Sequence, residues 1–326
     1  MRIAVTGSIA TDHLMTFPGK FTDQLIADKL DRVSLSFLVD ELAIRRGGVA
    51  ANIAFGLGVL GLRPLLVGAV GADFEEYRHW LEEHGVSTAC VRESLLKHTA
   101  RFVCTTDMDG NQIGSFYAGA MSEDAEIKLA PLAEEHGGID LVLIGAGDPG
   151  AMVAHTVDCR EAGLPYAADP SQQLARILDE GQVRSLVDGA DYLFGNEYEE
   201  GLIERKSGWG SAEILDRVGV RITTLGPGGA RIERKGEPAI TVPAVPDAKP
   251  VDPTGSGDAF RSGFLAAIAW GLSFERAAQL GNLMAVHALE AAGGQEYTLK
   301  SGPLSDRFAA AYGDPAAAEV ASHLPA

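Results

Sequence analysis

Short apolar strands alternate with helices along most of this 326-residue chain, and this alternation limits the possible folds more than any other feature of the sequence. Strands that alternate with helices form a parallel sheet covered by helices on both faces. The chain is therefore expected to be an α/β protein, a three-layer sandwich with a mostly parallel central sheet. Strands are predicted at residues 3–5, 65–70, 141–144, 166–168, 192–194 and 222–225.

Three β-rich segments do not follow this alternation, at about residues 12–20, 33–45 and 99–118. The last of them contains Asp109-Gly110, a pair typical of a tight hairpin turn. These segments can form a small separate sheet, and such an appendage is a natural lid for an active site. No break in composition divides the chain, so residues 1–326 are expected to form a single domain that carries a small β lid.

Composition excludes several classes of partner. The chain has 27 Lys and Arg against 45 Asp and Glu, a net charge of −18, which argues against binding to duplex nucleic acid and to anionic membranes. No apolar stretch is long enough to span a membrane, and the first residues lack a secretory signal. Three widely spaced cysteines indicate neither a zinc site nor a disulfide framework. A cytoplasmic protein is expected.

The segment 145–150 matches the dinucleotide-binding pattern G-x-G-x-x-G between a predicted strand and a helix. Asp169 stands 19 residues after Gly150, at the end of the next strand. However, Pro149 removes one backbone amide, and Asp148 places a negative charge where phosphates would bind. We interpret the segment as an ordinary strand-to-helix turn, and an NAD-dependent dehydrogenase remains an alternative.

The segment 252–260, DPTGSGDAF, carries the strongest chemical signal. Its glycines can bring successive N–H groups together at the start of a helix, where the dipole favours an anion. Gly255, Ser256 and Gly257 are therefore predicted to hold a phosphoryl group. Asp258 follows them; a carboxylate at a helix N-terminus is expected to stay ionised and can accept a proton from an alcohol. Alternatively, Asp258 only caps the helix.

This segment resembles the C-terminal signature of the ribokinase-like (PfkB) family of sugar and nucleoside kinases. Three other segments resemble motifs of that family in the expected order: GG-x-x-x-N at 47–52, N-x-x-E at 196–199 and T-x-G-x-x-G at 224–229. Together the four motifs extend over most of the chain. The resemblance implies a ribokinase-like fold and transfer of a phosphoryl group from ATP to a hydroxyl group.

The resemblance also implies the residues of the ATP side. Asp258 is the base, and the backbone at 255–258 stabilises the charge that develops on the phosphoryl group. Asn196 and Glu199 would hold Mg²⁺ through water, because this ion keeps several waters in proteins. Asp252 resembles the ligand of an activating K⁺, to which the loop at 293–294 could add carbonyl groups. The nucleotide contacts are expected from Thr224, Gly226, Gly229, Gly255 and Gly257.

On the acceptor side, Asp12 can take two hydrogen bonds from a vicinal diol such as that of ribose, although it could also be a turn residue. Gly48 allows close approach of the backbone, and Asn52 can both donate and accept. Phe102 and Phe116 lie at nearly symmetric positions about the hairpin turn, so they are expected to be neighbours that could sandwich a purine. The amides that could recognise the edge of the base belong to Gln172 and Gln173.

From end to end, the chain is similar to the adenosine kinases of actinobacteria, with the resemblance carried by AVTGSIATDHLM, VSLSFLVD, ADPSQQLAR and DPTGSGDAFRSGF. It implies phosphorylation of adenosine in purine salvage by a homodimer joined through its β lids. Ser8 corresponds to a contact with the ribose, and Ser36 to a lid residue that reaches the substrate site of the partner. A sugar kinase and a guanosine or inosine kinase remain alternatives. The intact Asp258 argues against an inactive nucleoside sensor.

Overall fold

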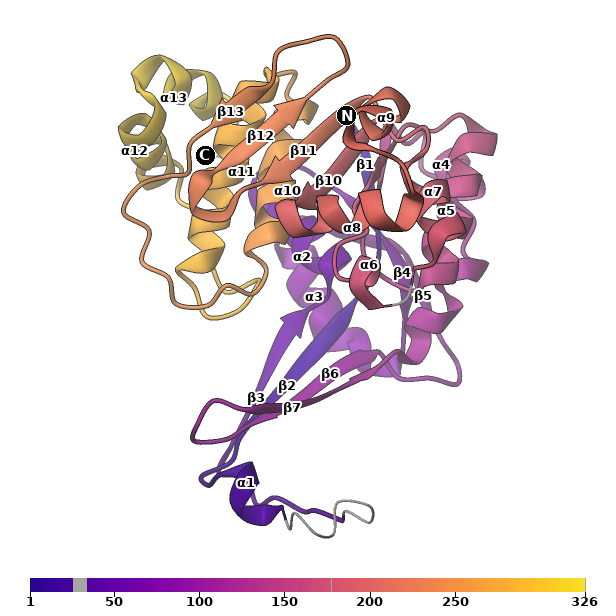
Figure 1. The fold of residues 1–326 in the computed structure, drawn as a ribbon, viewed down its shortest axis with the longest axis vertical. Helices are drawn as coiled ribbons and strands as arrows, with labels where there is room; N and C mark the ends of the chain where they lie inside the picture. The colour runs from indigo at the N-terminus through magenta and orange to yellow at the C-terminus, as the bar shows by residue number, and fades with distance from the viewer. Residues whose placement is uncertain (26–33, 177, 326) are drawn as a thin grey trace.

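The computed structural model describes residues 1–25, 34–176 and 178–325, which form two separate β-sheets (Figure 1). The larger sheet has the strand order β13-β12-β11-β10-β9-β8-β1-β4-β5. Its pairs from β11 to β5 are parallel, and β12 and β13 are antiparallel. The strands are β1 (Ile3–Thr6), β4 (Leu65–Val70), β5 (Ser87–Glu93), β8 (Leu141–Ile144), β9 (Tyr166–Ala168), β10 (Tyr192–Asn196), β11 (Val220–Thr224), β12 (Ala230–Glu233) and β13 (Ile240–Val242).

This sheet confirms the predicted α/β class and the mostly parallel pairing. All six predicted strands are present, within two residues of their expected bounds. The edge strand β5 was missed because exposed and charged residues interrupt its apolar pattern. The strand order reverses around β1, which has β4 on one side and β8 on the other. In such sheets, ligands bind beyond the carboxyl ends of the strands at the point of reversal.

Helices cover both faces of the large sheet. Along β1, Ile3 and Val5 face one apolar core and Ala4 faces the other, as the twofold repeat of a strand requires. The first core is formed with α2 (Val49–Val59), α3 (Glu75–Glu83), α10 (Ser256–Ala269), α11 (Phe274–Leu289), α12 (Ser301–Tyr312) and α13 (Asp314–Ala321). The second is formed with α4 (Leu129–Glu135), α5 (Pro149–Ala162), α6 (Gln173–Arg176), α7 (Glu180–Val187), α8 (Glu197–Ser207) and α9 (Ser211–Arg217).

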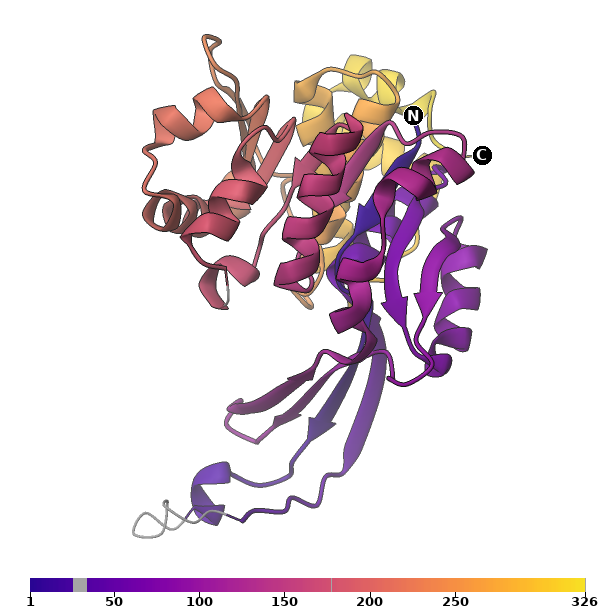
Figure 2. The ribbon, with the colours of Figure 1, turned by 90° about the vertical axis from the view of Figure 1, so that its right-hand side faces the viewer.

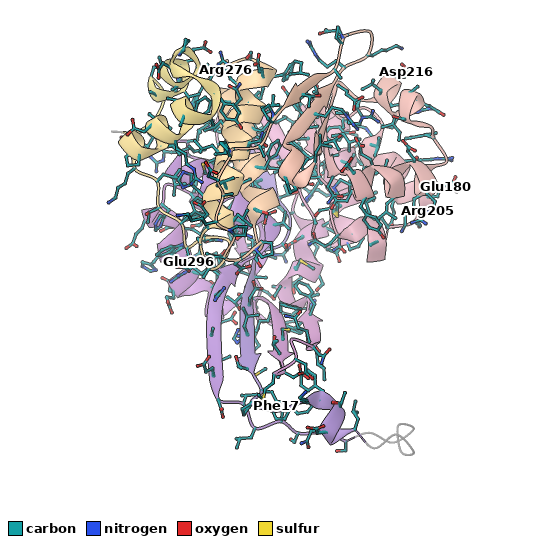
Figure 3. The ribbon with its side chains drawn as sticks, turned by 60° about the vertical axis from the view of Figure 1, so that its left-hand side comes forward. Phe17, Glu180, Arg205, Asp216, Arg276 and Glu296 are labelled. Carbon is teal, nitrogen blue, oxygen red and sulfur yellow. The ribbon has the colours of Figure 1, made fainter. Side chains whose placement is uncertain are left out.

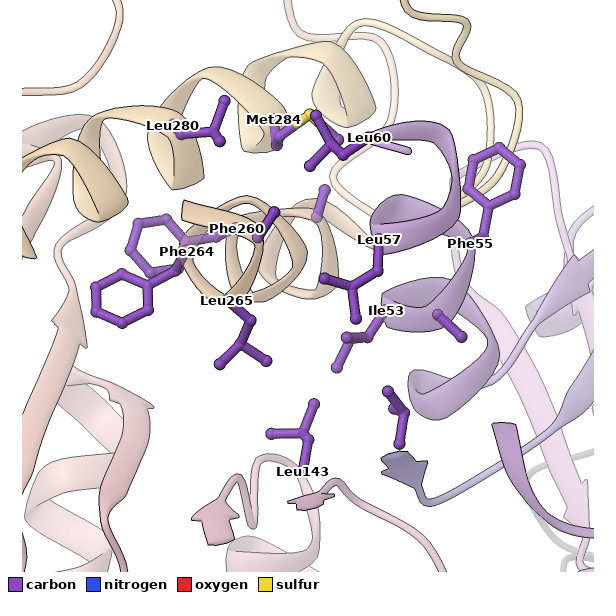
Figure 4. Packing of buried hydrophobic residues seen from close by; sticks show 14 of the residues in the cluster. Ile53, Phe55, Leu57, Leu60, Leu143, Phe260, Phe264, Leu265, Leu280 and Met284 are labelled. Atoms are coloured by element: carbon purple, nitrogen blue, oxygen red, sulfur yellow. The ribbon is translucent and has the colours of Figure 1, made fainter. Parts of the chain in front are cut away.

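The first core fixes α2 against α10. Figure 4 shows Leu57 of α2 and Leu265 of α10 directed into the same apolar space, with Leu280 of α11 above them. Their side chains are fully buried, and burying a leucine stabilises a fold by about 1.5–3 kcal/mol. Because these helices cannot shift independently, the residues near their N-termini keep a fixed separation.

The smaller sheet, which we call the lid, has the order β3-β2-β6-β7 and projects from the body of the molecule (Figure 2). Its β2–β6 pair is parallel, and its other two pairs are antiparallel. At its far end, near the short helix α1 (Phe21–Gln24), the ring of Phe17 lies 5.7 Å from Phe21 and 5.0 Å from Phe37 (Figure 3). The lid strands are β2 (Ala10–Thr16), β3 (Glu41–Gly47), β6 (Ala100–Thr106) and β7 (Gln112–Tyr117).

The separate sheet confirms the predicted lid, with two corrections to its segments. The first strand begins at Ala10 and ends at Thr16, and residues 34–40 lie outside the strands because pairing with β2 stops at Glu41. Residue 33 lies outside the described residues. The predicted hairpin at 99–118 is confirmed, with Asp107 accepting hydrogen bonds from the turn amides of Asp109 and Asn111.

The alanine-rich composition of residues 309–326 predicts a single terminal helix, and the structure differs from this expectation. The end of the chain forms two helices, α12 and α13, with Gly313 between them. Pro315 lies in the first turn of α13. Proline has no amide hydrogen, so it suits a helix start and not a helix interior. Residue 326 lies outside the described part of the chain. Within that part, no helix is both long and apolar enough to cross a membrane.

Candidate active site

The anion-binding turn predicted at 255–258 forms at the start of the 14-residue helix α10. Gly255 has a φ of 76°, and a Cβ there would lie 2.7 Å from Cα of Gly294, so only glycine fits. The amide of Ser256 donates to the Pro253 carbonyl at 3.2 Å. The predicted contribution of the Ser256 amide therefore needs correction. The predicted amides that remain for an anion are those of Gly255, Gly257 and Asp258.

Asp258 faces the start of α2, where Asn52 Nδ2 donates to Asp258 Oδ2 at 2.8 Å. Burial raises the pKa of Asp258 to about 7, although the hydrogen bond from Asn52 and the charge of Arg261 lower it. The helix start favours the ionised form of this carboxyl group, as expected, but desolvation acts against it and sets the direction of the shift. A base with a pKa near 7 is well suited to take a proton from a hydroxyl group at neutral pH.

A chain of buried hydrogen bonds sets the orientation of Asn52. Gln295 Nε2 donates to Asn52 Oδ1 at 2.9 Å and also contacts the hydroxyl of Tyr77, which donates to the Gly47 carbonyl at 2.9 Å. Because Oδ1 of Asn52 accepts from Gln295, its Nδ2 must face Asp258. Sequence reasoning missed both Gln295 and Tyr77; the only local signal was the Gly-Gly pair that precedes Gln295.

A pocket of about 400 Å³ lies between the lid and this helix start. It brings together ten of the predicted site residues: Ser8, Asp12, Gly48, Asn52, Phe102, Phe116, Gln172, Gly255, Gly257 and Asp258. The lid contributes one cross-strand row to it, because Asp12 of β2 is opposite Phe102 of β6, which is opposite Phe116 of β7. The predicted proximity of the two phenylalanines is confirmed. On the other side of Asp12, the same row continues to Arg45 of β3.

Asp12 lies in this row between Arg45 and Phe102, and its carboxyl group is partly buried. Burial raises its pKa to about 6; Arg45 opposes this rise, and Asp252 adds to it. At pH 7 the carboxyl group is therefore mostly ionised, with oxygens that can accept hydrogen bonds from a diol.

The turn into α2 brings backbone close to the pocket. Gly48 has a φ of 95°, and a Cβ there would lie 2.5 Å from the Ser8 carbonyl oxygen. The Ser8 hydroxyl accepts a hydrogen bond from the amide of Val49 at 2.9 Å, so it satisfies the start of α2 while lining the pocket. The sequence identified both residues, and the structure adds their mutual contact.

Two of the predicted substrate-binding residues lie elsewhere. Gln173 is 9% exposed, and its amide donates to the Gly147 carbonyl, so it supports a loop behind the pocket. Sequence alone could not separate it from the exposed Gln172, because neighbouring residues at a helix start face different surroundings. Ser36 is exposed on the lid, in the segment that precedes β3.

A second pocket, of about 550 Å³, contains the predicted nucleotide residues Thr224, Gly226 and Gly229. It shares Gly257 with the first pocket, so the two meet at the anion-binding turn. Most of its surface is apolar and comes from the loop after β13 and from α10 and α11: Ala244, Val245, Ala248, Pro250, Phe260, Ala285, Val286 and Leu289. Phe260 ends the 252–260 segment, but the other side chains belong to no motif, so sequence reasoning missed this apolar lining.

Asn196 and Glu199 lie beside this second pocket, because Asn196 is opposite Thr224 in the β10–β11 pairing. They cap α8 reciprocally: Asn196 Oδ1 accepts from the amide of Glu199 at 2.9 Å, and Glu199 Oε2 accepts from the amide of Asn196 at 2.8 Å. Burial raises the pKa of Glu199. A carboxylate oxygen has more than one lone pair, so Glu199 keeps acceptor capacity for the water-mediated Mg²⁺ contact that the resemblance implies. In the described chain, no cluster of three or more metal-ligating side chains forms a direct cage.

A buried ion pair between Arg261 and Asp169 supports the anion-binding turn. Arg261 of α10 donates to Asp169 Oδ1 at 2.7 Å and to the Gly257 carbonyl at 3.0 Å. Asp169 is fully buried in this contact, so it is not free to bind a ribose hydroxyl. Asp148 accepts from the amide of Ala151 at 3.0 Å as the cap of α5. These contacts confirm the interpretation of 145–150 as a strand-to-helix turn and remove the basis of the dinucleotide alternative.

Comparison with known proteins agrees with this geometry. The family model of pfkB family carbohydrate kinases matches residues 10–300. A nucleoside kinase of Methanothermobacter thermautotrophicus is 32% identical over 294 residues, which cover 88% of this chain and 92% of that protein. The solved structure of Burkholderia thailandensis nucleoside kinase in complex with inosine is 35% identical, with a TM-score of 0.82, and covers 96% of this chain and 98% of that one.

The chain therefore belongs to the PfkB family and has the ribokinase-like fold. It is a kinase, a phosphotransferase with an alcohol acceptor, and kinases of this family use ATP with a divalent metal. The adenosine kinase of Sinorhizobium meliloti, at 20% identity and a TM-score of 0.69, shares the fold.

Proposed function

We propose that this protein is a nucleoside kinase that transfers the γ-phosphoryl group of ATP to the 5′-hydroxyl of adenosine, giving AMP and ADP, as purine salvage requires. One observation carries the proposal: two pockets meet at Gly257, with Asp258 at the junction. The acceptor pocket has a carboxylate, Asp12, and two aromatic rings, Phe102 and Phe116. Two curated relatives with more than 30% identity are nucleoside kinases.

The chemistry follows from the positions of these residues. The Asp258 carboxylate accepts the proton of the 5′-hydroxyl, whose oxygen attacks the γ-phosphorus as the bond to ADP breaks. The amides at the start of α10 stabilise the charge on the transferring group. A bound Mg²⁺ would neutralise phosphate charge, and Asn196 and Glu199 would hold it through water.

The aromatic pair supports a purine over a free sugar. Stacking on aromatic rings accepts any base, because every base has a π-face. The amide of Gln172 both donates and accepts, so it can bind the edge of adenine or of hypoxanthine. Inosine is the second candidate, because the B. thailandensis kinase, at 35% identity, is solved in complex with inosine.

An assay of ADP release over adenosine, inosine, guanosine, ribose and fructose tests the proposal. We expect kcat/KM for adenosine to exceed that for ribose at least tenfold. Preference for a sugar over every nucleoside would contradict the nucleoside assignment, and preference for inosine would replace adenosine. The matched control is Asp258→Asn, which keeps the size of the side chain and removes the base.

We also propose a homodimer joined through the lids. The lid face opposite the pocket exposes Leu42, Ile44 and Ile113, at 57%, 61% and 49%. Exposed apolar patches of this kind commonly mark contacts between proteins. In such a dimer, Ser36 would reach the partner's substrate site. Light scattering is expected to give twice the chain mass, and Ile44→Glu to give a monomer; a monomeric wild type would contradict the proposal.

A further inference from the structure

Arg45 of β3 occupies the place at which the sequence predicted a K⁺ ion. Arg45 Nη1 donates to Asp252 Oδ2 at 3.0 Å, and their side chains are 31% and 22% exposed. The other carboxylate oxygen of Asp252 accepts from the amide of Thr254 at 2.9 Å. Both oxygens of the expected K⁺ ligand therefore already have a partner.

The guanidinium also lies against the loop that was expected to complete the K⁺ site. A Cβ placed on Gly293 would be 3.3 Å from Arg45 Cδ and 3.7 Å from Arg45 Nη1. Arg45 thus extends from the lid to Asp252 and the Gly293 backbone together. The neighbouring Gly294 packs against Gly255, at the start of the anion-binding turn.

A K⁺ ion does not fit beside this side chain. Arginine stays protonated at every pH of interest, and a second cation next to its guanidinium would be repelled in a partly buried site. The chain itself therefore already neutralises the Asp252 carboxylate, through its contact with Arg45 Nη1.

We propose that Arg45 is a built-in cation that takes the place of an activating K⁺ and keeps the anion-binding turn in its active geometry without any monovalent ion. The link runs from Arg45 to Asp252, from Asp252 to the Thr254 amide, and from Thr254 directly into Gly255. Because Arg45 is also opposite Asp12 in the lid, the same charge ties the acceptor end of the site to the phosphoryl end. Arg45 is a positioning residue, since it acts on the phosphoryl group through this turn.

The test compares the wild type with Arg45→Met in chloride salts of K⁺, Na⁺ and tetramethylammonium at equal ionic strength. Two properties are measured: kcat/KM for the preferred nucleoside and the midpoint of thermal unfolding. For the wild type, we expect kcat/KM to differ less than twofold between the salts and the unfolding midpoint to differ by less than 1 °C. For Arg45→Met we expect at least a tenfold loss in tetramethylammonium, with K⁺ but not Na⁺ restoring most of it and raising the midpoint.

Two further variants separate charge from structure. Arg45→Lys keeps a cation and is expected to remain independent of K⁺. Arg46→Met removes a charge from the next residue, which contacts Glu76, Trp80 and Glu296 on the other side of β3, and is expected to gain no response to K⁺ (Figure 3 labels Glu296).

The proposal is overturned by a K⁺ requirement in the wild type, by an Arg45→Met variant that is equally active in every salt, or by one that K⁺ does not restore. If Arg45→Met does not fold, the wild-type salt series alone decides. The measurement of kcat/KM rests on the proposed function, whereas the midpoint of thermal unfolding is measured without a substrate. If the protein phosphorylates no nucleoside, the proposed function is contradicted, but the unfolding midpoints in the three salts still test the role of Arg45.

Discussion

Replacing Gln295 by methionine is expected to raise the pH at which the kinase loses activity. Gln295 is 1% exposed, and it holds Asn52 so that Nδ2 points to Asp258. Methionine has a similar size and cannot donate to Asn52. The substitution leaves Asn52 Oδ1 without its donor, but it also removes Oε1 of Gln295, which has no hydrogen-bond partner among the described residues, so a large net loss of stability is not expected.

The size of the shift follows from the hydrogen bond at risk. A hydrogen bond to a charged group contributes about 1.5–3 kcal/mol, and one pKa unit corresponds to about 1.4 kcal/mol. Complete loss would thus raise the pKa of Asp258 by roughly one to two units. A released Asn52 amide can still donate in one of its two orientations, so we expect about half of this. The pKa of Asp258 would therefore rise by roughly half a unit to one unit from its value of about 7.

The sign of the effect is fixed by the role of the base. Asp258 must be ionised to accept a proton, so kcat/KM falls as the pH drops through its pKa, and in Gln295→Met this fall begins at a higher pH. The measurement is kcat/KM for the nucleoside from pH 5.5 to 9.5. Gln279→Met is the matched control, a buried substitution on α11 whose side chain contacts Arg276 and Glu275 and not Asn52. Superimposable profiles for wild type and Gln295→Met, or equal shifts in both variants, would refute the reasoning.

Three other predictions concern the base, the lid and the ion pair. Asp258→Asn is expected to lower kcat at least a thousandfold while nucleoside binding, measured by calorimetry, changes little; kcat near that of the wild type would exclude the base role. Phe116→Ala should raise KM for adenosine about tenfold or more and leave ribose nearly unchanged, whereas equal effects on both would reduce the ring to a packing role. Asp169→Asn leaves Arg261 charged, buried and half-paired, so urea unfolding should show a loss of about 3–5 kcal/mol. Asp188→Asn, at an exposed ion pair, should cost under about 1 kcal/mol, and similar losses in both variants would contradict the argument.

Local patterns were sufficient for much of the fold. The apolar runs of β4 and β8 and the turn at Asp109-Gly110 are properties of a few adjacent residues, and the structure contains all of them. Edge elements were harder to predict, because a strand such as β5 is buried on fewer sides and needs fewer apolar residues. The sequence predicted one helix where the structure has α12 and α13, because alanine favours a helix on both sides of Gly313.

The sequence by itself determined the chemistry of the site: a glycine turn before a helix, an acid at Asp258, and an amide at Asn52. Only the tertiary structure decided how these groups are tuned and supported. The Arg45–Asp252 contact joins residues 207 positions apart, and Gln295 reaches Asn52 across 243 positions. The strength of a charge or hydrogen bond depends on distance and burial, which arise only when such distant segments pack together. A short motif can therefore name the base, but its pKa and the cation beside it belong to the folded chain.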